Sequence, residues 1–360
     1  MDLVTHGLTS VAIARAFFPR AGKVALFCTI LSGISADADW VSAYGGASAF
    51  LGWHRTSFHS IAAAILMPIA VVVIVAFLAH RWGGILIPLG TLPAGENLPE
   101  HPAGRRIFVF RRFFAYILGA PFCAALLHIA MDSCQSEGVA LFWPFSAKRI
   151  AADCLPCLDP WILMILVGAV ALPELLHLVS SEIGAKAKKP RGQNGAVIGL
   201  ALLVVYIGVR AMLHSNALAM MQSRTFHGET PRRTAAFPET LSLVTWHAIA
   251  ETERALNQVT VDVAGGGSFD PDTSMRIFKP EPSPELDAAR ETEAAARFLA
   301  FARFPKATAE KTEKSYVVQL RDLRFAASGE TQHEIAAIIR LDEAAKVTSE
   351  ELIWARDLHR

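Results

Sequence analysis

The 360-residue sequence predicts a mainly α-helical protein, in which a polytopic helical membrane bundle is followed by a C-terminal α+β soluble domain. Hydrophobic residues make up 52% of the chain and charged residues only 19%, which is an unusually apolar balance for a soluble enzyme. Nearly every long apolar run lies before residue 214. We therefore expect a helical membrane domain over residues 1–213 and a soluble domain over residues 214–360.

The composition also excludes some classes of function. A net charge of +1 gives the chain no overall basic field, so we expect no nucleic-acid partner. The sequence contains no G-x-x-x-x-G-K-S/T motif, which excludes a P-loop ATPase. Five cysteines are too few for a disulfide scaffold, and the pair Cys154 and Cys157 either stays reduced or forms one disulfide outside the cytoplasm.

The membrane domain is predicted from runs that approach the roughly 20 apolar residues needed to cross a bilayer. Leu3–Phe18 and Val24–Ser35 are two shorter stretches separated by a segment with proline and glycine, so we expect a helical hairpin there. A cleaved signal peptide is the alternative, but no basic region precedes the first stretch. Four further runs are interpreted as embedded helices: Ile61–Leu78, Phe113–Leu127, Trp161–Val179 and Ala196–Met212.

Basic residues orient this bundle, because Lys and Arg accumulate on the cytoplasmic side of a membrane protein. The connections 36–60 and 133–160 carry only Arg55, Lys148 and Arg149. We therefore expect those connections, and the C-terminal domain, to be extracytoplasmic. The connections on the opposite side carry many more basic residues: Arg15, Arg20, Lys23, Arg81, Arg105, Arg106, Arg111, Arg112, Lys186, Lys188, Lys189 and Arg191.

Histidines and aspartates gather at one end of the predicted spans. His6 lies about 20 Å of helix before the hairpin turn and Asp37 about the same distance after it, so both return to one membrane face. His59 opens the next span at that face, and His128 and Asp132 close the third, four residues apart on one helix face. Imidazoles and carboxylates from several rigid elements are what a divalent metal site requires. The alternative is that these residues simply meet water at the ends of the spans.

The motifs that contain these residues resemble a known family. In order, they are Thr5-His6, Asp37-x-Asp39, His54-Arg55-x-x-x-His59-Ser60, His128-x-x-x-Asp132 and Trp143-Pro144-Phe145-Ser146. This set resembles the bacterial membrane-bound metal-dependent hydrolases, the YdjM/YbcI-like group also called LexA-binding inner-membrane-associated hydrolases. The resemblance is strong over residues 1–160 and loose over the remaining spans, and the family usually has proline where this chain has Ala36.

That family is in turn distantly similar to zinc-dependent phospholipase C and P1-type nuclease, which cleave phosphate esters with zinc. The resemblance implies a divalent metal, in the first place Zn²⁺, held by His6, Asp37, His59, His128 and Asp132. Between Asp37 and Asp39 the assignment stays open, because either could bridge metals while the other orients a ligand histidine. Arg55 has the planar fork that matches a phosphate, or else it is an interfacial arginine whose charged end reaches water. Arg55 and Asp39 are the candidate catalytic residues.

The resemblance implies a metal-dependent hydrolase in the cell inner membrane. A site at the bilayer surface suits an amphiphilic or lipid-linked phosphoester substrate. One alternative is an ion-binding transporter, which also uses intramembrane polar residues; the ligands, however, gather at one face and no inverted repeat is visible. The other is a regulatory membrane protein that binds a protein partner, which the sequence does not identify.

The C-terminal domain is predicted to contain a mostly antiparallel sheet. Leu286–Ala302 is expected to form one helix, after Ser283-Pro284 and before Pro305. No catalytic constellation occurs in this domain; Trp246, His247 and Glu251 are expected to serve the core or an interface, and the domain to gate substrate or bind a partner. The expected strands are Leu243–Ile249, Val259–Val263, Met275–Phe278, Tyr316–Leu320, Leu323–Ala326 and Ile335–Leu341.

Overall fold

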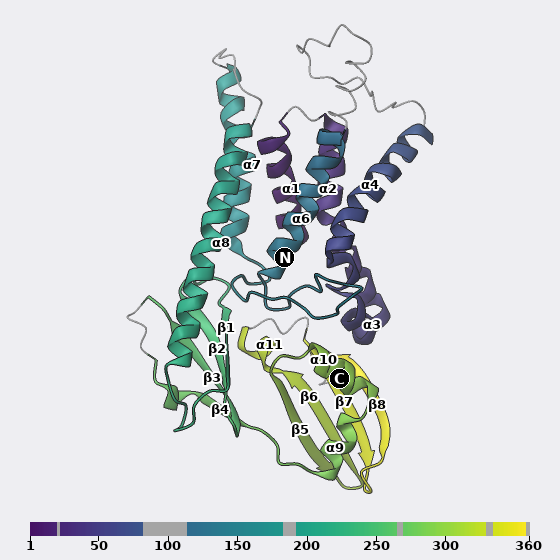
Figure 1. Ribbon diagram of the computed structural model, residues 1–360, viewed down its shortest axis with the longest axis vertical. Coiled ribbons are helices and arrows are strands. Elements are labelled where there is room, and N and C mark those ends of the chain that lie inside the picture. The colour runs from purple at the N-terminus through teal and green to yellow at the C-terminus, as the bar shows by residue number, and fades with distance from the viewer. Residues whose placement is uncertain (20–21, 82–113, 183–191, 265–268, 329–333, 358–360) are drawn as a thin grey trace. The chain divides into compact units, whose positions relative to one another are not determined.

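The computed structural model describes residues 1–19, 22–81, 114–182, 192–264, 269–328 and 334–357 (Figure 1). The chain divides into two compact units. The first contains Met1–Ala38, Arg55–Ala151 and Leu158–Val209. The second contains Asp39–His54, Ala152–Cys157 and Arg210–Arg360.

The first unit is helical. The first two helices pack against each other and against α6, as the predicted hairpin requires, and α4 contacts both α2 and α6 (Figure 1). Helix α1 also contacts α7. The helices are α1 (Leu3–Phe17), α2 (Lys23–Ile34), α4 (Ile61–Arg81), α6 (Ala120–Ser133) with the π-helical segment η3 (Phe114–Gly119) before it, α7 (Pro160–Glu182) and α8 (Gln193–Gln222).

Local sequence explains where these helices begin and how closely they approach. Asp2 caps α1 by accepting a hydrogen bond from the backbone N–H of Thr5 at 2.9 Å. Gly33 of α2 lies where three helices meet, because a Cβ at this position would fall 1.8 Å from Oγ of Ser10 and 3.3 Å from Cβ of Ala124. Only glycine therefore lets α2 approach α1 and α6 at this depth.

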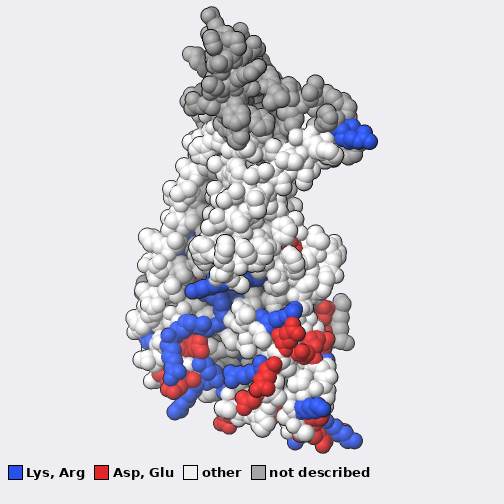
Figure 2. All heavy atoms as spheres, turned by 45° about the vertical axis from the view of Figure 1, so that its right-hand side comes forward, with Lys and Arg blue, Asp and Glu red and all other residues white. Residues whose placement is uncertain are grey.

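Three of the described segments have the length and apolar composition of membrane spans. In the part of the chain that the structure describes, Lys23–Trp53, Ile61–Leu78 and Gln193–Gln222 are long and apolar enough to cross a bilayer. Leu3–Phe17, Ile117–Ser133 and Pro160–Leu176 are shorter apolar helices. On the face turned to the viewer in Figure 2, the described helices show a broad band without Lys, Arg, Asp or Glu.

Two four-stranded antiparallel sheets form most of the second unit (Figure 1). The first has the order β1-β2-β3-β4: β1 (Arg233–Pro238), β2 (Thr245–Glu251), β3 (Ala255–Asp262) and β4 (Met275–Phe278). The second has the order β5-β6-β7-β8: β5 (Pro305–Thr312), β6 (Ser315–Asp322), β7 (Ile335–Asp342) and β8 (Val347–Trp354). The unit also contains the helices α3 (Gly46–Trp53), α9 (Pro284–Arg290), α10 (Glu293–Phe301) and α11 (Leu323–Ser328), and the short 3-10 helices η4 (Pro271–Thr273) and η6 (Ala355–Asp357).

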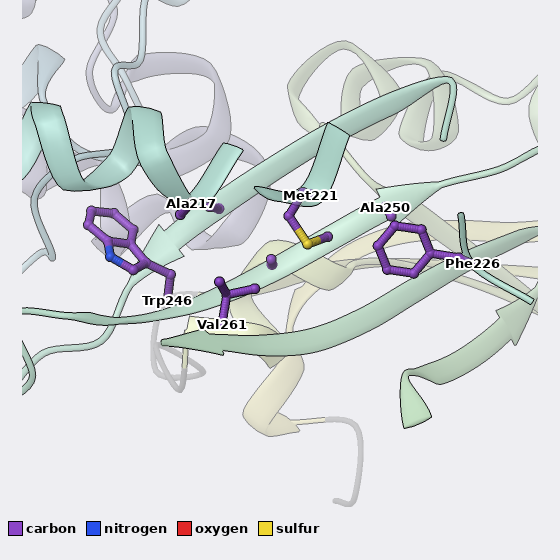
Figure 3. Packing of buried hydrophobic residues seen from close by; sticks show 8 residues of the cluster. Ala217, Met221, Phe226, Trp246, Ala250 and Val261 are labelled. Carbon is purple, nitrogen blue, oxygen red and sulfur yellow. The ribbon is translucent and has the colours of Figure 1, made fainter. Parts of the chain in front are cut away.

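Each sheet is covered by helical residues. The C-terminal end of α8 continues past residue 213 and packs Ala217 and Met221 onto the first sheet, against Trp246 and Val261 (Figure 3). On the second sheet, Phe298 of α10 packs with buried residues of β6 and β7. These two cores are apolar and separate, so each sheet has its own hydrophobic support.

Two predictions in this unit are wrong. Leu286–Ala302 is not one helix, because Thr292 interrupts it and caps α10 by accepting a hydrogen bond from the backbone N–H of Ala295 at 3.3 Å. Leu323–Ala326 is not a strand but part of α11, where Oδ1 of Asp322 accepts a hydrogen bond from the backbone N–H of Arg324 at 3.1 Å. Strands β1, β5 and β8 were not predicted.

Candidate metal centre

Four elements of the first unit bring five acidic and imidazole side chains together. His6 lies on α1, His128 and Asp132 on α6, Asp37 in η1 (Ser35–Gly45) and His59 at the end of η2 (Ser57–His59). All five side chains are buried. The residues that the sequence places at one membrane face are therefore in one place, and the α1–α2 hairpin is the reason that His6 reaches Asp132.

The distances between donor atoms are those of a metal site. Nε2 of His6 lies 3.2 Å from Oδ1 of Asp132, and Nε2 of His59 lies 3.2 Å from Oδ2 of the same carboxylate. A tetrahedral ion with bonds of about 2.1 Å keeps its donor atoms roughly 3.4 Å apart. One donor atom from each of His6, Asp37, His128 and Asp132 lies within 4.8 Å of all the others. This buried cluster could hold a metal ion.

The hydrogen bond of His128 fixes which of its nitrogens faces the cluster. Nδ1 lies 2.7 Å from the carbonyl oxygen of Gly33, which can only accept, so Nδ1 carries the proton. In a neutral ring, Nε2 then presents its lone pair. That atom lies 3.2 Å from Nε2 of His59, 3.7 Å from Oδ1 of Asp37 and 3.6 Å from Oδ2 of Asp132. Lone pairs that converge in this way can be bridged by a metal ion or by a shared proton.

Two further atoms support this interpretation. Oδ2 of Asp37 and Nδ1 of His6 are buried and have no hydrogen-bond partner among the described residues. A buried polar atom without a partner is costly unless it binds water or an ion. The rings of His6 and His128 are stacked, with centroids 3.6 Å apart, so they present their edges to the same space. The donor set and its orphaned oxygen therefore fit a divalent ion.

Arg55 reaches the cluster from a strained backbone position. Its φ of 56° lies in the left-handed region, which is uncommon for a residue with a side chain and is often found at functional sites. The buried guanidinium lies 3.8 Å from Oδ2 of Asp132 through Nη2. The same Nη2 donates to Oε1 of Gln135 at 2.5 Å, and Nε lies 3.2 Å from Oε2 of Glu137. A positive charge is thus held beside the candidate ligands.

Gln135 and Glu137 were not singled out from the sequence. Gln135 also accepts a hydrogen bond from the amino group of Met1 at 3.1 Å, and that amino group contacts Asp132 as well. Both residues lie just beyond α6, which ends at Ser133. The signal that could have identified Gln135 is its spacing of three residues from Asp132, whereas Glu137, five residues from Asp132, has no comparable signal.

Asp39 has a different partner from Asp37. Its Oδ1 lies 3.0 Å from Nδ1 of His54, and both residues belong to the second unit. The ring of His54 stacks on Phe50, with centroids 4.2 Å apart, and meets the edge of Trp40 at 5.0 Å. Asp37 therefore lies in the cluster, and Asp39 pairs with His54.

Three further acidic residues, Asp153, Asp159 and Glu174, have structural partners. Asp159 caps α7 through the backbone N–H of Trp161 at 3.0 Å and accepts from the hydroxyl of Tyr206 at 2.8 Å. Asp153 accepts two hydrogen bonds from Arg303, at 2.6 and 2.7 Å. In the fifth predicted span, α7 continues through Pro173, and Glu174 pairs with Arg15 of α1 at 3.1 Å.

The remaining groups of the tail do not form a site of their own. Trp246 is fully buried in the core of the first sheet, as expected. Nε2 of His247 lies 2.8 Å from Oε2 of Glu239, and Glu251 faces Lys279 at 2.8 Å. Cys154 and Cys157 are not joined by a disulfide bond.

These features define a membrane-associated protein with apolar spans and a buried His/Asp cluster. Residues 1–217 match the model of the YdjM inner membrane protein family, and the chain belongs to that family. The family and the apolar helices indicate the inner membrane. Residues 284–359 match the YfhP C-terminal α/β plait domain. No curated protein and no solved structure matches the chain.

Proposed function

We propose that this protein is a membrane-bound, divalent-metal-dependent hydrolase that acts on a phosphoester of an amphiphilic or lipid-linked substrate. The observation that carries the proposal is the buried convergence of three imidazoles and two carboxylates from four elements. Nitrogen and oxygen donors at this spacing suit Zn²⁺. The ligands that we assign are His6, Asp37, His59, His128 and Asp132.

When bound, such an ion supplies Lewis-acid polarisation of a phosphoryl oxygen and lowers the pKa of a water molecule that it contacts. The residues of the chain supply orientation. The Gly33 carbonyl holds His128 with Nε2 toward the cluster. Asp132 lies 3.2 Å from both His6 and His59 and so fixes the approach of two rings.

Arg55 is the residue that we assign to the phosphate of the substrate. Its fork of donors matches phosphate oxygens, and its place beside Asp132 puts positive charge where negative charge grows during phosphoester cleavage. Gln135 and Glu137 hold this side chain in place. We assign Asp37 as the carboxylate ligand and Asp39 as a positioning residue that orients His54.

The substrate class follows from the membrane. A site built at the ends of apolar helices is accessible to molecules that carry both a lipid part and a phosphate. We further propose that six membrane-embedded segments place the C-terminal domain outside the cytoplasm. We also propose a distant relationship to zinc-dependent phospholipase C and P1-type nuclease, which would imply the same chemistry.

The test combines metal analysis with hydrolysis of phosphodiesters in mixed micelles. We expect the wild type to bind zinc and to hydrolyse such substrates, and His128→Ala to lose both properties, because an open ligand set no longer holds the ion. His247→Ala is the matched control, since this histidine pairs with Glu239 in the second unit. Bound metal without hydrolysis would favour ion binding or transport, and absence of both would contradict the proposal.

A further inference from the structure

An exposed aromatic turn follows the helix that carries His128 and Asp132. Phe142, Trp143 and Phe145 all present their side chains to the outside, and Phe145 is 95% exposed. Exposing three large apolar side chains in four residues to water is unfavourable, so such a patch marks an interaction surface. Neither the candidate metal site nor its proposed chemistry uses these residues.

The turn is held firmly in shape. Its base is closed by two hydrogen bonds between the backbones of Val139 and Ile150, at 2.9 and 3.0 Å. Within it, the backbone N–H groups of Phe145 and Ser146 both donate to the carbonyl oxygen of Phe142. Val139 is fully buried against Ala64 of α4 and Ala125 of α6. The aromatic side chains are therefore displayed by a rigid loop of the first unit.

The loop lies at the level where a predicted span begins. The carbonyl oxygen of Leu141 accepts a hydrogen bond at 3.0 Å from the backbone N–H of Ile61. Ile61 is the first residue of the span Ile61–Leu78, whose outward side chains, such as Ile65 and Leu66, are exposed and apolar. The first residue of a span lies near the boundary between acyl chains and headgroups, where tryptophan is enriched.

The residue types that follow the turn also suit a position at the boundary between acyl chains and headgroups. Lys148 follows the aromatic turn and is exposed. A lysine near the surface of a membrane is attracted to anionic headgroups. The exposed apolar face of α4 is continuous with the turn through the Ile61–Leu141 bond, which favours lipid rather than a second protein as the occupant.

We propose that residues 142–148 form a membrane-docking loop, in which the aromatic side chains enter the headgroup–acyl boundary of the bilayer and Lys148 contacts anionic headgroups. This inference rests on the membrane spans and not on the hydrolase proposal. Docking of the loop would also affect the position of Arg55. The backbone N–H of Ala140 donates to the carbonyl oxygen of Arg55 at 2.9 Å, so a docked loop also holds Arg55 near the headgroups.

The test places p-benzoylphenylalanine, a photo-crosslinking analogue of phenylalanine, at single phenylalanine positions of the full chain. The protein is reconstituted into vesicles of phosphatidylethanolamine and phosphatidylglycerol and irradiated, and lipid adducts are identified by mass spectrometry. The test position is Phe145. Phe77, 63% exposed on α4, is the control expected to meet lipid, and Phe278, 65% exposed on β4, is the control expected to meet water.

We expect lipid adducts at positions 145 and 77 and none at position 278. Adducts at position 145 no more frequent than at position 278 would overturn the proposal, because the loop would then lie in water. Adducts to protein rather than lipid at position 145 would also overturn it and would indicate a protein partner. Either result can be told apart from failure of the hydrolase proposal, because metal content and hydrolysis are measured independently.

Discussion

At the scale of single residues, Arg55 is the group on which charge balance in the first unit depends. Its guanidinium lies between the carboxylates of Asp132 and Glu137, and the side chains of Arg55 and Glu137 are only 4% and 11% exposed. Ion pairs at such depth are costly to break, because the remaining charge stays in a medium that solvates it poorly. Arg55 therefore has a structural role as well as the role that we propose in substrate binding.

We expect Arg55→Ala to lower the free energy of unfolding by about 3–5 kcal/mol, since Glu137 loses the cation that it faces. Adding Glu137→Gln should restore part of this loss. The control is Arg340→Ala, which removes an ion pair with Glu351 whose side chains are 50% and 44% exposed. Exposed pairs contribute only about 0–1 kcal/mol. Thermal unfolding of the detergent-solubilised variants measures all three, and equal losses from Arg55→Ala and Arg340→Ala would contradict the expectation.

A second residue-scale prediction concerns Glu229 in the second unit. A side-chain hydrogen bond with Thr252, together with the backbone N–H of Arg254 and the charge of Arg276, holds the pKa of Glu229 below its ordinary value of 4.5. Because the folded pKa is depressed, the contribution of Glu229 to stability is present above its unfolded pKa and is lost as pH falls through the folded pKa.

Hydrogen–deuterium exchange can check the direction in which the contribution of Glu229 to stability changes with pH. Glu229→Gln should speed exchange of residues 226–232 and 252–256 relative to the wild type near neutral pH. The difference should shrink as pH falls below 4.5 and through the lowered pKa of Glu229, because the wild-type carboxylate then becomes protonated. Comparing the two proteins at each pH cancels the intrinsic pH dependence of exchange. If the difference in exchange rate between Glu229→Gln and the wild type grows on acidification, the expected pH dependence is wrong.

Most of the metal-site geometry could be predicted from residue spacing, but not the choice between the two aspartates. The i, i+4 spacing of His128 and Asp132 and the hairpin that returns His6 to Asp37 both follow from helical periodicity. Asp37 and Asp39 are separated by one residue in a 3-10 helix, and the direction of each depends on how η1 begins. The left-handed backbone conformation of Arg55 could not be predicted from the sequence, because glycine is the residue that usually adopts this conformation.

At the scale of elements, close approach of α7 and α8 depends on a glycine. A Cβ at Gly199 would fall 2.3 Å from Cβ of Ala169, and one at Gly195 would fall 2.4 Å from Cγ of Pro173. These two glycines form a G-x-x-x-G pattern in an apolar helix, which is a packing motif of membrane helices. The helices meet here because neither glycine has a side chain.

We expect Gly199→Ala to destabilise the α7–α8 contact by about 1–3 kcal/mol, because the added methyl group cannot rotate away from Ala169. Gly208→Ala is the matched control in the same helix, where nothing lies within 4 Å of the added Cβ. That change should alter stability by less than about 1 kcal/mol, the ordinary difference in helix propensity. Thermal unfolding in detergent compares the two, and similar behaviour would mean that α7 and α8 are not packed through this glycine.

The strands that the sequence did not predict are mainly sheet edges. β5 and β8 are the outer strands of the second sheet, and most of their residues are exposed or half-buried. Edge strands carry charged residues that block further pairing, so they lack the alternation and apolar content by which strands are recognised. The buried strand β7, by contrast, has five buried residues in succession and was predicted. Burial pattern thus accounts for β5, β7 and β8, but not for β1, which was missed although its last four residues are buried, or for the exposed edge strand β4, which was predicted.

At the scale of the whole molecule, the path of the chain and its basic residues together determine which side of the membrane each part faces. His6, Asp37, His59 and Asp132 meet in one cluster, so the chain returns to the same face before α4 and again at the end of α6. If α7 leaves that face and α8 returns to it, the residues that follow α8 belong to the face of the cluster. The number of crossings therefore decides the location of the C-terminal domain.

We expect that location to be extracytoplasmic. On the face of the cluster, Arg55 is buried in the site, so Lys148 and Arg149 are the basic residues left in the predicted connections, whereas the opposite side carries the clusters around Arg81 and Lys186. Residues near Lys186 lie outside the described part of the chain, and their side is a prediction from sequence alone.

Alkaline phosphatase fused after Arg360 should be active, because it folds only outside the cytoplasm, and green fluorescent protein at the same point should be dark. The control fusion after Arg81, at the far end of α4, should give the reverse pair of signals. If the fusions after Arg360 and after Arg81 both report the cytoplasm, one span has been miscounted. If the fusion after Arg360 reports the cytoplasm and the fusion after Arg81 reports the outside, the bundle is inverted and its cluster faces the cytoplasm. That result would exclude lipids of the outer leaflet as substrates.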